Sequence, residues 1–133
     1  MANTTFTGPV RSQNGFQSIT IDSSTGAVTV DATFGTAVIG ATQSLSGAGA
    51  VNLTSLLTSL TTSGVSQALT LADGSVGQLK VITHTVDGGS AVLTPTTKIG
   101  FSTVTFTAVG DTVTLVYTSA GWAIIGSRGV TIA

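Results

Sequence analysis

The chain has 133 residues, a length that fits one domain, and at this size folding buries roughly two thirds of the surface that the unfolded chain exposes. The net charge at pH 7 is -1 and the isoelectric point is near 5.4, so the clustered Lys and Arg that nucleic acids and anionic membranes require are missing. Cysteine is absent, which excludes disulfides, thiolate metal sites and cysteine nucleophiles.

Charged side chains are scarce along the whole sequence. Asp, Glu, Lys and Arg make up 7% of the residues, whereas an ordinary soluble domain carries about a quarter. Thr supplies roughly a fifth of the chain and Ser roughly a ninth, and these uncharged side chains suit the outer face of a β-sheet. With a mean hydropathy of +0.53 and few charges to repel neighbours, such a surface is poorly protected from association. Either the protein aggregates or association is its purpose.

The N-terminal stretch FTGPVRSQNGF is too irregular for a central strand. We expect residues 1–16 to form an extended arm that adds to the sheet edge of a partner by main-chain bonding. The arm offers apolar anchors, a proline that keeps it out of a regular strand, and a cation for a charge-assisted hydrogen bond: Phe6, Pro9, Val10, Arg11 and Phe16. The alternative is a frayed terminus, or one that folds back over its own sheet.

The beginning of the chain, MANTTFTG, has neither the basic start nor the apolar run of about 7 to 15 residues that define a signal peptide. No apolar stretch approaches the ~20 residues that a membrane-spanning helix needs. These features predict a soluble chain that is not exported.

The next segments indicate a hairpin and then an ambiguous region. SITID and AVTVD flank Ser23–Gly26, where a glycine is available for a positive φ. In VNLTSLLTSLTTSG, leucines at 53, 56, 57 and 60 have helical spacing, but the residues between them are nearly all Ser and Thr, which are mediocre helix formers. A short helix near 53–60 and a strand with a loop are therefore both open.

The second half alternates with period two, which is typical of strands with one buried face. ALTL, QLKVITHTV and AVLTP predict three strands, and Pro95 marks an edge or the exit of the last one. Residues 101–126 predict a three-stranded meander with a turn at Gly110-Asp111. Its apolar face would hold Val104, Phe106, Val113, Leu115, Tyr117, Trp122 and Ile124.

Short strands at this spacing, with turn signals between them, predict an all-β fold: an antiparallel sandwich, a jelly roll or a barrel. No linker is visible in the sequence. We therefore expect one β domain over residues 1–133, with residues 1–16 as its extended N-terminal arm.

The chain offers little material for catalysis. His84 is the only histidine, and it alternates with Ile82 and Val86, so the pattern favours a structural histidine in a core or a subunit interface. The one acid close to it in sequence is Asp87, no nucleophile motif is present, and the Asp residues sit beside glycines or at strand ends, as turn residues do. We expect no enzyme activity, no catalytic residues, no metal and no cofactor.

Tyr117 and Trp122 fall in the apolar register of the predicted meander. This placement favours anchoring in a core or a subunit interface, so we group them with His84 as candidate interface residues. Stacking of the two aromatic rings on a sugar is the alternative.

Several stretches resemble proteins of tailed-phage virions. The matching segments are LTLADGSVGQLKVI, DGGSAVLTPTT and TVTFTAVGDTVTLVYTSAGWAIIG, and the opening TFTGPVRSQNGF with TGAVT is similar to the start of small structural proteins of phages of marine bacteria. At this length the chain most resembles a capsid decoration (cement) protein.

The resemblance implies a β-rich homotrimer on the outer surface of the capsid, made in the host cytoplasm, that stabilises the head by clamping neighbouring copies of the major capsid protein. The partners would be further copies of the chain and the major capsid protein, with no nucleic acid, membrane or small-molecule substrate. The alternative is a host-attachment module, adhesin-like or tail-fibre-like, that binds a surface glycan.

Overall fold

The computed structural model describes residues 16–34, 38–39 and 41–133, and it divides the chain into two compact units, residues 1–40 and 41–133. In the first unit, β1 (Phe16–Ile21), β2 (Val28–Phe34) and β3 (Val38–Ile39) form a small antiparallel sheet in that order. The predicted hairpin between the first two strands is confirmed.

The turn of this hairpin is organised by Asp22. Its carboxylate accepts hydrogen bonds from the hydroxyl and the amide of Ser24 and from the amide of Thr25, at 2.6, 2.7 and 3.0 Å. These bonds, led by the Ser24 hydroxyl, lower the pKa of Asp22 to about 2. The Asp side chain thus closes the turn by bonding to nearby main chain, as Asp commonly does in turns.

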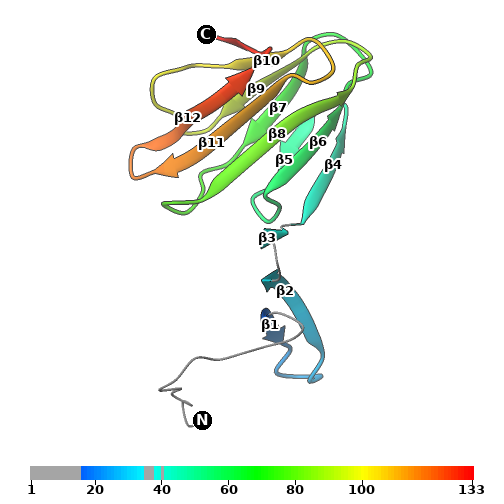
Figure 1. Ribbon diagram of the computed structural model, residues 1–133, viewed down its shortest axis with the longest axis vertical. Helices are drawn as coiled ribbons and strands as arrows, with labels where there is room; N and C mark the ends of the chain where they lie inside the picture. The colour runs from blue at the N-terminus through cyan, green and yellow to red at the C-terminus, as the bar shows by residue number, and fades with distance from the viewer. Residues whose placement is uncertain (1–15, 35–37, 40) are drawn as a thin grey trace. The chain divides into compact units, whose positions relative to one another are not determined.

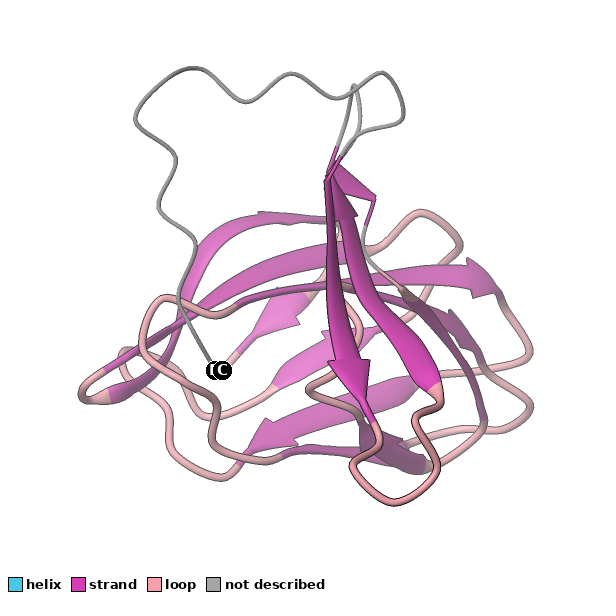
Figure 2. Cartoon of the chain, turned by 90° about the horizontal axis from the view of Figure 1, so that it is seen from below, coloured by secondary structure: helices cyan, strands magenta, loops and turns pink. Residues whose placement is uncertain are grey.

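The second unit is a sandwich of two mixed five-stranded sheets, drawn as a ribbon in Figure 1 and seen from another side in Figure 2. Its strands are β4 (Thr42–Ser46), β5 (Gly49–Val51), β6 (Leu57–Thr61), β7 (Gln67–Leu71), β8 (Leu79–Val86), β9 (Ala91–Pro95), β10 (Val104–Phe106), β11 (Thr112–Thr118), β12 (Gly121–Arg128) and β13 (Thr131–Ile132). One sheet has the order β12-β11-β8-β6-β4 and the other β13-β10-β9-β7-β5.

Successive strands from β4 to β9 alternate between the two sheets, so that strands of one sheet are joined through the other. As a result, β4, β6 and β8 are parallel to one another, as are β5, β7 and β9. The all-β prediction is confirmed, but the prediction of purely antiparallel sheets is wrong for these strands. A connection that crosses to the facing sheet and returns brings the next strand back in the same direction, whereas a tight hairpin would reverse it.

The core lies between the sheets and is built from the residues whose alternation the sequence shows. Leu60, Ile82, Val113, Leu115 and the other buried apolar side chains come from strands of both sheets. Their neighbours along each strand are mostly Thr and Ser and face outward or lie half-buried, which gives the period-two pattern its physical meaning.

The structure decides one open alternative and corrects one local prediction. Residues 53–60 contain no helix: a loop leads into β6 at Leu57, so the strand-and-loop alternative holds. The predicted meander over 101–126 is only half right, because β11 pairs with β12 and β8 while β10 belongs to the facing sheet. The connection from Thr107 to Asp111 crosses between the sheets, so β10 and β11 do not form a hairpin.

At one end of the sandwich the turns that cross between sheets lie directly against each other. A Cβ on Gly88 would overlap the carbonyl oxygen of Thr62, and a Cβ on Gly89, where φ is +146°, would overlap that of Gly64. Only glycine lets the main chains of neighbouring turns approach so closely.

This packing predicts that Gly89→Ala destabilises the sandwich. The added methyl group meets main-chain atoms that cannot move aside, and the positive φ is itself unfavourable for alanine, so we expect a loss of about 2 kcal/mol or more in the free energy of unfolding, measured by urea titration. Gly126→Ala is the matched control, because a Cβ there meets nothing within 4 Å. Equal stability of the two variants would contradict the proposed packing.

Candidate functional site

The polar side chains buried inside the sandwich are engaged in the fold. The Thr62 hydroxyl donates to the carbonyl oxygen of Gly89 at 3.0 Å and accepts from the Gly88 amide at 2.9 Å. Since the hydroxyl has one proton, the His84 Nε2 atom at 3.0 Å must donate to it, which places the proton of a neutral ring on Nε2. The Nδ1 atom of His84 is buried and has no hydrogen-bond partner among the described residues.

Asp111 holds the crossing between β10 and β11. Its carboxylate accepts from the amides of Thr107 and Ala108 at 2.7 and 3.0 Å, and its own carbonyl oxygen accepts from the amide of His84. Burial acts to raise the pKa of Asp111, but the two amide bonds and the nearby His84 outweigh it and lower the pKa. Asp111, rather than Asp87, which is the acid near His84 in sequence, is thus the acid whose main chain bonds to that of His84.

His84 and Trp122 have no exposed surface in the structure, and Tyr117 is half-buried. The Trp122 indole donates to the carbonyl oxygen of Ala72 at 2.9 Å and meets the Tyr117 ring edge-to-face at 5.1 Å between centroids. The core alternative thus holds for His84 and Trp122, and as buried side chains they offer no face to a second chain. Tyr117 stays a candidate interface residue.

No pattern in the sequence singles out Lys80, whose side chain is fully buried from β8 beside Ile82 and His84. Its ammonium donates to the carbonyl oxygen of Ser55 at 2.6 Å. Burial lowers the pKa of Lys80 to about 8, because removal from water disfavours the charged form. Among the described residues, the carbonyl oxygen of Ser55 is the hydrogen-bond acceptor that the buried ammonium contacts.

This burial predicts an unusual dependence of stability on pH. In the unfolded chain Lys80 keeps its proton up to the ordinary lysine pKa of 10.5, while the folded protein releases it near 8, so the free energy of unfolding rises between about pH 8 and 10.5. We expect a rise of no more than about 3 kcal/mol, measured by denaturant titration across this range. Lys80→Met should abolish the rise, and Lys98→Met, which alters a half-buried lysine, should retain it. A rise that survives in Lys80→Met would refute this assignment.

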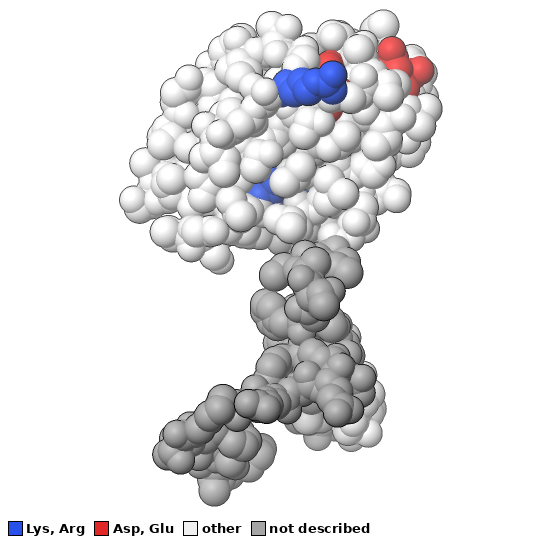
Figure 3. Space-filling model, viewed as in Figure 1, with Lys and Arg blue, Asp and Glu red and all other residues white. Residues whose placement is uncertain are grey.

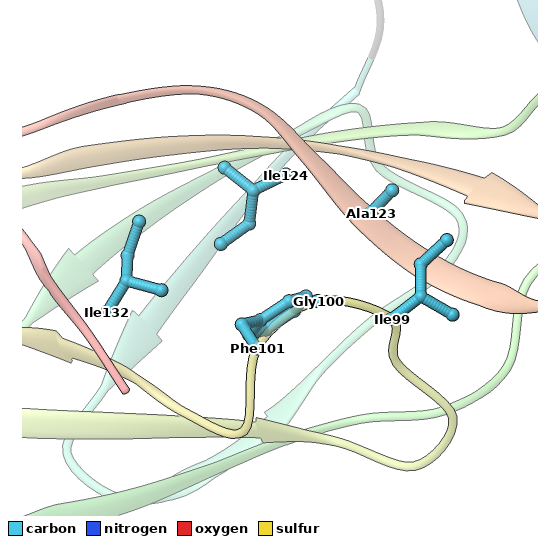
Figure 4. A pocket seen from close by; sticks show the side chains of 6 residues that line it. All are labelled: Ile99, Gly100, Phe101, Ala123, Ile124 and Ile132. Carbon is cyan, nitrogen blue, oxygen red and sulfur yellow. The ribbon is translucent and has the colours of Figure 1, made fainter.

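The surface of the second unit carries an apolar pocket of about 360 Å³ near its C-terminal end. Figure 4 shows the pocket between β12 and β13, with the side chains of Phe101, Ile124 and Ile132 around one space. The lining residues are Ile99, Gly100, Phe101, Ala123, Ile124 and Ile132, none of which is charged or polar in its side chain.

The pocket adjoins an edge strand that is only partly covered. The segment Thr97–Ile99 runs parallel to the start of β12, where the amide of Trp122 donates to Thr97 and its carbonyl oxygen accepts from Ile99. At Gly100, where φ is +78°, the chain turns away, and β12 continues to Arg128 as the last strand of its sheet. Ala123 and Ile124 of β12 line the pocket, and from Ile124 onward the outer edge of β12 pairs with no other described strand.

A β-bulge at Ile125, between the pairs Leu115–Ile124 and Thr114–Gly126, is one feature of this edge that protects against association, but other such features are few. In the view of Figure 3 the second unit shows few charged side chains, and on the exposed half of β12 the only charge is Arg128 at its end. Ile125 on the same strand is 60% exposed, and Ile99 and Ile132 beside the pocket are also exposed. Monomeric proteins usually block such edges with Lys, Pro or a covering loop.

The predicted arm lies almost entirely outside the described residues. This holds for Phe6, Pro9, Val10 and Arg11, while Phe16 is the first residue of β1. The arm therefore stays a prediction. The pocket was missed because its residues come from three separate segments, and the apolar groups IGF and AI that supply most of it resemble core sequence.

Comparison of the sequence with models of protein families and with curated proteins gives no match. Within the described residues, no helix is long and apolar enough to cross a membrane. The same part of the chain contains no group of three or more His, Cys, Asp or Glu side chains that could hold a metal ion.

Proposed function

We propose that the protein is a non-enzymatic structural protein of a phage virion, a capsid decoration (cement) protein that trimerises on the outside of the head and clamps neighbouring major capsid subunits. The observation that carries the proposal is the free edge of β12 beside an apolar pocket, on a surface with very few charges. The resemblance of the sequence to virion modules supplies the identity of the partner.

The surface suits a protein that works by being covered. Exposed Ile99, Ile125 and Ile132 gain free energy when they are removed from water, at about 25 cal/mol for each Å² of apolar surface buried. With so few charges, little electrostatic repulsion or desolvation opposes contact with another protein. The Thr-rich strands would keep the rest of the surface polar, which would help the unassembled chain to stay in solution.

The clamp would act by mass action. A protein that binds the assembled shell and not its separated subunits stabilises the shell by RT ln(1 + [L]/Kd) for each site, as any ligand specific to one state does. Each binding site would span more than one capsid subunit, so the shell could not open without losing the bound copies.

Heads of the encoding phage that lack the protein should burst at a lower temperature, and in lower concentrations of chelator, than heads saturated with it. The measurement is release of packaged DNA on heating, followed with an intercalating dye, with and without added purified protein. Bare heads mixed with heat-denatured protein serve as the control. Equal resistance of bare and saturated heads would count against the clamp.

The glycan-binding alternative would use Tyr117, Trp122 and the loop from Asp87 to Ser90. The Trp122 side chain is buried and bonded to Ala72, so it offers no stacking face, and Tyr117 is half-buried. In the loop from Asp87 to Ser90, the Asp87 carboxylate accepts from the Gly89 amide, and the Ser90 hydroxyl accepts from that of Ser66. These contacts serve the turn itself, and no observation on the described residues favours a sugar.

A further inference from the structure

We draw no further inference here: the strongest candidate, the apolar pocket that Phe101, Ile124 and Ile132 line beside the outer edge of β12, carries nothing because nothing in the structure shows what covers it.

Discussion

The sandwich depends on close contact between the main chains of the turns that cross from one sheet to the other. From β4 to β9 the chain crosses to the facing sheet after every strand. The crossings at one end of the sandwich therefore lie side by side, at the spacing of the strands that they join. Gly88 and Gly89 let the last of these turns lie against Thr62 and Gly64 with no room for a side chain. The Thr62 hydroxyl then joins the two turns and fixes the ring of His84 behind them. The amide of Thr62 also donates to the carbonyl oxygen of Val86, so these contacts hold the end of β8 against the end of β6.

The strands could be predicted from the sequence because the alternation of apolar and polar residues within each strand shows which of its side chains are buried. Thr112–Thr118 and Leu79–Val86 alternate between inward and outward residues, and both are strands in the structure. Their partners could not be predicted, because alternation is the same whether a strand pairs with its neighbour in sequence or crosses to the facing sheet. The turn at Gly110-Asp111 shows the difficulty: its composition fits a hairpin, yet Asp111 uses its carboxylate to bond Thr107 and Ala108 and redirects the chain to the other sheet.

The candidate site divides in the same way. The burial of His84 and Trp122 followed from their place in apolar registers. The burial of Lys80 could not be predicted, because a lysine in a strand normally faces water. Its buried ammonium donates to the carbonyl oxygen of Ser55, which is 25 residues away in sequence. The pocket was equally hidden: Phe101, Ile124 and Ile132 become neighbours only when the edges of two sheets meet. Pairing across distant segments is a tertiary property that local periodicity does not encode.

Under the proposed function, the scarcity of charge and the open edge of β12 would both follow from one requirement, which is contact with another protein. An edge strand protected by lysines would stay monomeric but could not accept another strand, whereas an apolar edge without charges is available for binding and is also prone to aggregation. In this chain, pairing of Thr97–Ile99 shortens the open edge, and Ser127 and Arg128 follow the run of apolar residues at its end. What remains open is the short stretch beside the pocket. Such an arrangement would limit non-specific pairing and, under the proposed function, would leave this one stretch available for contact with the capsid.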